Sequence, residues 1–346
     1  MSREISKEAL QLHHANINID GHCDTVLGIQ RGLLDFTNGF TPPEDQVEAK
    51  KIISHIDLPR MKAGGTTTQV FAAFAEKQYL PADATNQALR LFDLLYQAFE
   101  ESEDFVMVKN AADIRAAKAG GKVGGMLSIE GAESLEGELA ILRNFHRLGL
   151  RQVGLTWNWR NQAADGLGEA RTGGGLTEFG VALIKEANRL GIILDIAHLA
   201  PEGIRDVLAL SEHPIVDSHC GARGLTDHVR NLDDAQLDGM AKNGGVVCVT
   251  FVPPFINGEV KEYDDSEKAS IEDVLNHIEY IARRIGVEHV GIGSDFDGFG
   301  GYLHGLEDVS KMPALTQGLM DRGFKADEIA KIMGGNYLRV IQQVCG

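Results

Sequence analysis

Residues 177–211, TEFGVALIKEANRLGIILDIAHLAPEGIRDVLALS, contain the pattern that decides the fold. The segment Thr177–Leu190 has apolar residues at helical spacing, and Gly191 follows it at the place where glycine commonly ends a helix. The run Gly191–Ala197 is apolar on both parities, which is typical of a parallel strand covered by helices. Helical spacing returns over Glu202–Ser211. The stretch therefore predicts a helix, a buried strand and a second helix.

The same alternation continues in both directions along the chain. Eight short β-rich runs are expected to be strands: Ala15–Asp20, Thr66–Ala75, Lys122–Ile129, Gln152–Thr156, Gly191–Ala197, Pro214–Asp217, Gly245–Phe251 and Glu288–Ser294. The other segments with helical spacing are Asn86–Glu101, Leu135–Leu148, Asp233–Asn243, Ile271–Ile285 and Ala326–Gln343. Eight units in 346 residues predict a (β/α)8 barrel, or TIM barrel, that spans residues 1–346 as one domain.

An open, doubly wound sheet is the competing fold. Such a sheet normally carries a glycine-rich fingerprint directly after its first strand. Here the first expected strand is followed by Gly21 and then by His22–Thr25, HCDT. The barrel is therefore the favoured interpretation.

Composition excludes several classes of protein. The chain has 50 acidic and 33 basic residues, a formal charge of −17, and we expect neither nucleic acid nor an anionic membrane as a partner. No apolar leader or 18-residue apolar run is present. The cysteines lie far apart and form no CxxC pair, which indicates a reducing compartment. These features predict a soluble, cytoplasmic protein.

Residues that can bind metal follow five of the eight expected strands. In a barrel of this kind the active site lies at the carboxyl ends of the strands, where side chains from different strands converge. The converging set consists of three imidazoles and three carboxylates: His22, Asp24, Glu130, His198, His219 and Asp295.

Alternation along a strand separates these residues from their neighbours. His22 and Asp24 are two residues apart and point the same way, whereas Cys23 points back toward the helices, as Cys220 does beside His219. We expect both cysteines to be packing residues. One catalytic ion needs about three protein ligands. Six convergent groups therefore predict two ions that share a carboxylate, with zinc or another first-row metal as the expected ion and hydrolysis as the reaction.

The motifs also resemble a known family. The strings are Asp20–Asp24 (DGHCD), Ser128–Gly131 (SIEG), Asp217–His219 (DSH), Arg230–Asn231 (RN), Gly291–Gly298 (GIGSDFDG) and Gly334–Arg339 (GGNYLR). In this order they are similar to the membrane dipeptidase, or renal dipeptidase, family of zinc enzymes. That family belongs to the amidohydrolase superfamily. The resemblance runs from about residue 16 to residue 342.

The resemblance implies roles for individual residues. One zinc ion would be held by His22 and Asp24 and the other by His198 and His219, with Glu130 as the bridge. Asp295 corresponds to the acid/base residue that moves a proton from the attacking water to the leaving amine. Arg230 corresponds to the arginine that binds the free C-terminal carboxylate of a dipeptide, a partner that suits a planar guanidinium. Tolerance of a D-residue at the C-terminal position is a further expectation.

One position departs from the family. Some members have a histidine after the fourth barrel strand that contacts the scissile carbonyl, but this sequence has Trp157 there, followed by Asn158. Asn158 could donate a hydrogen bond to the substrate instead, or the metal ions could polarise the carbonyl alone. Trp157 is expected to form a wall of the pocket. Family members are often dimers, and vertebrate members carry a secretion signal and a lipid anchor, which we do not expect here.

Two other functions stay open at this point. Another amidohydrolase reaction, on an N-acyl amino acid, a lactone or a cyclic amide, could use the same metal frame. Many such relatives bridge their ions with a carboxylated lysine after the fourth strand, and no lysine stands beside Trp157.

A barrel that binds a phosphorylated ligand is the more distant alternative. Its support is the glycine-rich stretch Gly298–Gly301 after the last strand. His228 and His304 are expected in loops on the active-site side.

Overall fold

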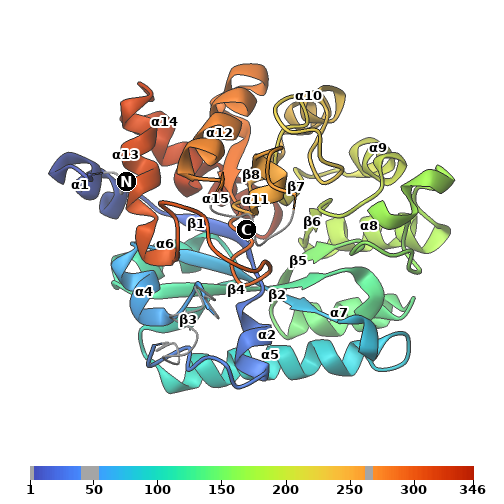
Figure 1. Ribbon diagram of the computed structural model, residues 1–346. Coiled ribbons are helices and arrows are strands. Elements are labelled where there is room, and N and C mark those ends of the chain that lie inside the picture. Colours follow the sequence, from blue (N-terminus) through green and yellow to red (C-terminus); the bar gives the residue numbers. More distant parts are fainter. Residues whose placement is uncertain (1–3, 40–53, 262–267) are drawn as a thin grey trace.

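The computed structural model describes residues 4–39, 54–261 and 268–346. Eight parallel strands close into a barrel in the order β1, β2, β4, β5, β6, β7, β8 and β9, with β9 paired to β1. Figure 1 shows helices in a ring around these strands. The predicted (β/α)8 fold is therefore confirmed.

The barrel strands overlap the eight predicted runs. Their bounds are β1 Ile19–Cys23, β2 Thr68–Phe74, β4 Val123–Glu130, β5 Leu150–Gly154, β6 Ile193–Asp195, β7 Val216–Cys220, β8 Val246–Val249 and β9 Val290–Ile292. The first strand is displaced from its prediction, because α1 occupies Lys7–Ala15 and β1 continues to Cys23. His22 therefore lies within the strand. A short additional strand, β3 (Phe105–Met107), pairs with the beginning of β4 and was not predicted.

The helices are amphipathic and most of them cover the outside of the barrel. Their bounds are α2 Thr25–Gln30, α4 Leu58–Ala63, α5 Ala84–Glu101, α6 Ala111–Ala119, α7 Leu139–Arg147, α8 Glu178–Leu190, α9 Pro201–Leu210, α10 Asp234–Asn243, α11 Pro253–Ile256, α12 Ile271–Ile285, α13 Pro313–Asp321, α14 Ala326–Ala330 and α15 Asn336–Val344. Gly191 and Gly244 end α8 and α10 in the left-handed conformation, as glycine at this position allows.

The predicted helix Ala326–Gln343 is interrupted. A π-helical turn, Lys331–Gly335, separates α14 from α15, and a side chain on Gly334 would overlap the backbone oxygen of Ile17. The interruption redirects α15 across the amino-terminal end of the barrel, where Tyr337 and Ile341 pack against Ile19 and Val246 at the beginnings of strands. The barrel is thus closed at this pole, and Figure 1 shows α15 near the middle of the ring.

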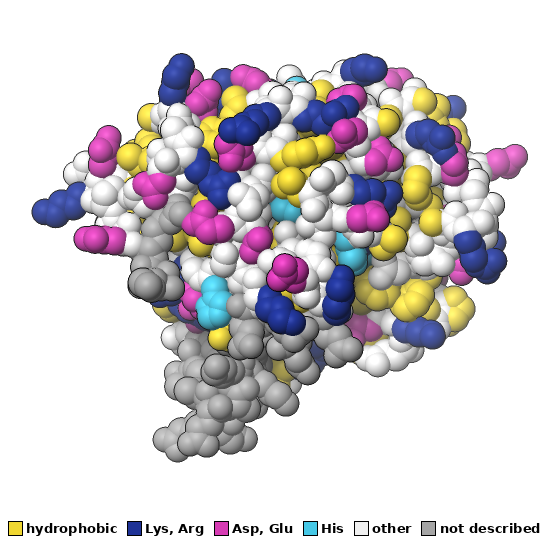
Figure 2. Space-filling model, turned by 45° about the horizontal axis from the view of Figure 1, so that its top comes forward, with side chains coloured by type: hydrophobic (Ala, Val, Ile, Leu, Met, Phe, Trp, Pro, Cys, Tyr) yellow, Lys and Arg dark blue, Asp and Glu magenta, His cyan; other side chains and the backbone are white. Residues whose placement is uncertain are grey.

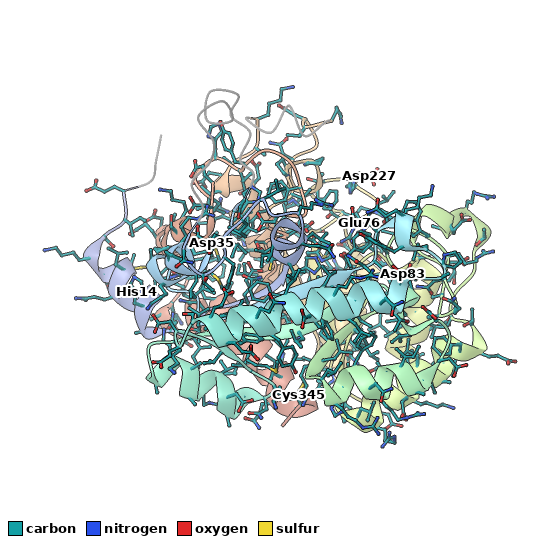
Figure 3. All side chains as sticks on the ribbon, turned by 90° about the horizontal axis from the view of Figure 1, so that it is seen from below. His14, Asp35, Glu76, Asp83, Asp227 and Cys345 are labelled. Atoms are coloured by element: carbon teal, nitrogen blue, oxygen red, sulfur yellow. The ribbon has the colours of Figure 1, made fainter. Side chains whose placement is uncertain are left out.

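The opposite pole carries the loops that follow the strands. Figure 3 shows Glu76 and Asp227, which lie in loops after β2 and β7, toward the end of the molecule opposite to Cys345. Since α15 and the residues after it close one end, the accessible mouth lies at the carboxyl ends of the strands. Among the described residues, no helix is long and apolar enough to cross a membrane.

Candidate metal centre and active site

Three of the six predicted residues lie in strands, and three lie just beyond them. His22, Glu130 and His219 belong to β1, β4 and β7. Asp24, His198 and Asp295 follow β1, β6 and β9. All six are at least nine-tenths buried. The structure brings the whole predicted set together at the carboxyl ends of the strands.

Glu130 lies at the centre of this cluster. Its Oε1 is 3.1 Å from His198 Nε2, 3.6 Å from His219 Nε2 and 3.8 Å from His22 Nε2. A single carboxylate that faces three imidazoles from different strands has the placement needed to share two cations. The geometry therefore agrees with the bridging role implied for Glu130.

A second group of oxygens lies around His22. Its Nε2 is 3.6 Å from Asp24 Oδ2 and 3.8 Å from Asp295 Oδ1. Two sets of three ligand atoms lie within 4.8 Å of one another: His22 with Glu130 and His219, and His22 with Asp24 and Asp295. Each set offers three ligand atoms to a cation, and His22 takes part in both sets.

Buried polar atoms without hydrogen-bond partners indicate what kind of ligand fits between these residues. His22 Nε2 and Asp24 Oδ1 are buried and have no hydrogen-bond partner among the described residues. His198 Nε2 and His219 Nε2 lie 3.0 Å apart, close enough to bind one cation together. Buried polar atoms without partners are costly, and a divalent cation satisfies nitrogen and carboxylate ligands together. The donor set fits zinc or a similar first-row metal.

The hydrogen bonds of two histidines direct their Nε2 atoms inward. Ser218 Oγ lies 2.8 Å from His219 Nδ1, and Asn158 Oδ1 lies 2.9 Å from His198 Nδ1. When the Nδ1 atom of a histidine is engaged in this way, its Nε2 atom is left for a metal.

Burial and charge shift the titration of the cluster. Burial raises the pKa of Glu130 well above its ordinary value, and the neighbouring Asp24 raises it further. Burial opposes the charged form of His22, but Glu130 and Asp24 outweigh it and raise the pKa to about 10. Burial lowers the pKa of both His198 and His219 well below the ordinary value. The crowded carboxylates therefore favour positive charge beside them, while His198 and His219 favour their neutral form.

Asp295 occupies an unusual backbone position. Its φ is 61°, in the left-handed region, and the carboxylate is thereby turned back toward Asp24 and His22. Burial raises its pKa to about 7, and the charge of Asp24 contributes. A side chain on Gly298 would overlap the carboxylates of Asp24 and Asp295, so only glycine fits there.

That crowding also bears on the phosphate-binding alternative. The first glycine of the stretch Gly298–Gly301 lies against two carboxylates. An anionic phosphate would be repelled at this place. Gly298 is better explained by the space that these two carboxylates need.

An open cavity of about 420 Å³ lies in front of the cluster. It is lined by Asp24, Glu130, Trp157, Asn158, His198, His219, His228, Arg230, Phe255, Asp295 and Gly298, together with Leu167, Gly168 and Val229. All the predicted site residues except His22 line it. His22 lies behind them, in contact with the ring of His219 at a centroid distance of 3.9 Å.

Arg230 lies in the same cavity, on the side of β7 and β8. Its Nη2 donates to the carbonyl oxygen of His219 at 2.9 Å, while its Nε is buried without a partner among the described residues. The guanidinium lies 5.5 Å from the centroid of the Phe255 ring. Arg230 is thus fixed by the backbone beside a metal ligand and keeps donor capacity for an anion.

Phe255 and His228 also line the cavity and were not predicted as site residues. Phe255 belongs to no recognisable motif. From the sequence alone, an apolar residue of this kind indicates only packing in the core. His228 was expected in a loop on this side, and its ring stacks on Phe255 at 4.4 Å. His304 is not among the residues that line the cavity.

Trp157 and Asn158 lie on the opposite wall. The ring of Trp157 is 5.7 Å from the His198 ring and 4.7 Å from the Trp159 ring. Trp157 is therefore in a position to form a wall, as predicted. The oxygen of Asn158 is already engaged by His198.

A parallel (β/α)8 barrel with this cluster at its open mouth has the architecture of a metal-dependent hydrolase. Comparison with known protein families identifies which class of hydrolase this is. The family model "Membrane dipeptidase (Peptidase family M19)" matches residues 6–345, and the chain belongs to this family of metallopeptidases. The resemblance identified from the motifs is confirmed.

Characterised relatives agree with this assignment. The chain is 34% identical to "Dipeptidase tcpJ" of Claviceps purpurea (strain 20.1), over 94% of this chain and 76% of the relative. It is 31% identical to "Dipeptidase verJ" of Clonostachys rogersoniana, over 94% and 84% of the two chains.

Solved structures give the same result. A metallopeptidase of family M19, dipeptidase AC, is 31% identical, with a TM-score of 0.83 over 96% of this chain and 99% of the other. A metallopeptidase from Rhodobacter sphaeroides, liganded with a phosphinate mimic of the dipeptide L-Ala-D-Ala, is 30% identical. Its TM-score is also 0.83, over 95% of this chain and 99% of that one.

Proposed function

We propose that the protein hydrolyses dipeptides that have a free C-terminal carboxylate, with two zinc ions in the cluster around Glu130. The observation that carries the proposal is the presence of the ligand cluster, Asp295 and Arg230 in one cavity. A catalytic site for peptides needs a means to activate water, a proton carrier and a group that positions the substrate. These residues supply all three.

The ligands divide as the resemblance implies. His22 and Asp24 would hold one ion, His198 and His219 the other, and Glu130 would bridge them. When bound, two such ions polarise the scissile carbonyl and lower the pKa of water, so that a nucleophile is available near neutral pH. Cations would also offset the repulsion among Asp24, Glu130 and Asp295.

Asp295 is the proposed proton carrier. It accepts a proton from the attacking water and delivers it to the nitrogen of the leaving amino acid. Its carboxylate faces the ligand cluster at 3.8 Å from His22 Nε2, and an adjacent cation would lower its raised pKa so that it can accept this proton.

Arg230 positions the C-terminal end of the substrate. Its guanidinium would bind the C-terminal carboxylate, since a forked donor and a carboxylate form paired, charge-assisted hydrogen bonds. The scissile bond of a dipeptide lies one residue from that carboxylate, so a guanidinium that holds the carboxylate would place this bond beside the metal cluster. Tolerance of a D-residue at the C-terminal position is supported by the L-Ala-D-Ala mimic bound to the relative from Rhodobacter sphaeroides.

The test compares L-Ala-L-Ala, L-Ala-D-Ala and L-Ala-L-Ala amide as substrates of the protein loaded with two equivalents of zinc. We expect cleavage of both free dipeptides and, for the amide, a kcat/KM at least about 10-fold lower, because a charged hydrogen bond is lost. Cleavage of the amide at the same rate would contradict the role of Arg230. Cleavage of an N-acyl amino acid or a lactone in place of every dipeptide would favour another amidohydrolase reaction.

A matched pair of variants separates the role of Asp295 from general effects of charge. Asp295→Asn should lower kcat by about 100-fold or more, the usual contribution of a general acid or base. Asp227→Asn removes an exposed acid from the loop that carries Arg230, and kcat should stay unchanged. Equal rates for Asp295→Asn and the unaltered protein would exclude Asp295 as the proton carrier.

A further inference from the structure

His198 is held in place from outside its own strand. It lies beyond the end of β6 and has a φ of 65°, which a residue with a side chain seldom adopts. Its carbonyl oxygen accepts hydrogen bonds from Leu167 N at 2.8 Å and from Thr156 Oγ1 at 3.3 Å. The loop after β5 therefore supports the backbone of this ligand.

The same loop supports the imidazole. Asn158 Oδ1 lies 2.9 Å from His198 Nδ1, while His198 Nε2 lies 3.1 Å from Glu130 Oε1. An amide oxygen can only accept a hydrogen bond, so Nδ1 carries the proton and Nε2 keeps its lone pair. Asn158 is itself anchored, because its carbonyl oxygen accepts from Gly168 N at 2.9 Å.

We propose that Asn158 is a positioning residue that fixes the orientation and tautomer of His198 for metal binding. The proposal rests on the metal centre of the proposed function, and it replaces the substrate contact expected for Asn158. At His219 the contact to Nδ1 comes from Ser218 Oγ, its own neighbour in β7. His198 follows its strand in a left-handed conformation, and a residue of another loop performs this task.

The test measures zinc affinity rather than activity. Asn158→Ala and the size-matched Asn158→Leu remove the acceptor, and Asn158→Asp keeps it. Competition with a chelator should show one of the two zinc ions bound about 10–100-fold more weakly in Asn158→Ala and Asn158→Leu, as for other partners of ligand histidines. Asn158→Asp should retain both ions. Trp159→Phe changes an exposed neighbour in the same loop and should leave both affinities unchanged.

Activity assays at saturating zinc then separate the two roles of Asn158. We expect KM to stay within about 3-fold of the unaltered value in Asn158→Leu, while the activity lost at limiting zinc returns when zinc is added. Unchanged zinc affinity in whichever of Asn158→Ala and Asn158→Leu is folded would overturn the proposal, whatever happens to KM. If the unaltered protein itself binds no zinc, the proposed metal centre fails, and the positioning role fails with it.

Discussion

At the scale of single residues, the interaction of Arg230 with the substrate can be isolated by changing both partners. Arg230→Met should lower kcat/KM for a free dipeptide by about 10–100-fold, because a charge-assisted hydrogen bond contributes roughly 1.5–3 kcal/mol. The same substitution should have a much smaller effect on the dipeptide amide, which lacks the carboxylate. The two changes are therefore expected to be non-additive in a double-mutant cycle.

Arg230→Lys is the control for charge. Lysine keeps the positive charge but cannot form the paired hydrogen bonds of a guanidinium, so we expect an intermediate kcat/KM. Arg230 also donates to the carbonyl of His219, and zinc affinity should be measured for each variant. Additive effects of Arg230→Met and amidation would show that the guanidinium does not contact the substrate carboxylate.

Residue types and strand parity predicted much of this site. His22 and His219 lie in the cluster, while Cys23 and Cys220 are fully buried in the hydrophobic core, as alternation along a strand requires. The partner of His198 could not be predicted in this way. Asn158 and His198 meet through two loops, and neither loop conformation follows from a local pattern.

At the scale of elements, α15 depends on one buried side chain at its beginning. Asn336 Nδ2 donates to the carbonyl oxygens of Val287 at 2.7 Å and Val290 at 2.8 Å, and thereby ties the helix to the beginning of β9. Asn336→Ala would leave two carbonyls without this donor. We expect the free energy of unfolding to fall by about 1–3 kcal/mol in urea denaturation.

Gln343→Ala provides a matched control on the same helix. Gln343 is exposed, and its replacement by alanine should change the free energy of unfolding by less than about 0.5 kcal/mol. Zinc affinity should be unaltered in both variants, since α15 lies at the pole opposite to the metal cluster. An effect of Asn336→Ala no larger than that of Gln343→Ala would contradict the anchoring role.

The interruption before α15 is a feature of the secondary structure that the sequence did not predict. The periodicity of Ala326–Gln343 indicates one helix, because helical spacing continues across the interruption. The helix is interrupted at Gly334, whose backbone is not helical and lies close to Ile17, a residue far away in the sequence. Strand positions were predictable from local composition, whereas the packing of the last helix across the barrel was not.

At the scale of the whole molecule, charges of both signs share the surface. Figure 2 shows acidic and basic side chains interspersed over the described part of one face. Many of the acids form ion pairs at the surface, and exposed pairs contribute little to stability. The pH dependence of stability is therefore expected to come from buried groups rather than from this surface.

His277 is one such group, and it connects α12 to the loops after β7 and β8. Its Nδ1 accepts from Ala222 N at 2.9 Å, and its Nε2 lies 3.1 Å from the carbonyl oxygen of Ile256. Both nitrogens of the neutral ring are thus satisfied, and protonation would break the bond to Ala222. Burial lowers the pKa of His277 to about 4.

The direction of the pH effect follows from this shift. The unfolded chain takes up a proton on His277 below its ordinary pKa of about 6.5, whereas the folded protein does not until about pH 4. Stability from the neutral ring is therefore present above pH 6.5 and is lost as the pH falls toward 4. The loss amounts to about 3 kcal/mol at most.

Urea denaturation of the metal-free protein between pH 7 and pH 4 should show a shallower decline in the free energy of unfolding for His277→Asn than for the unaltered protein. His304→Asn, at an exposed histidine, should keep the original slope, and equal slopes in all three proteins would exclude His277 as a source of acid sensitivity.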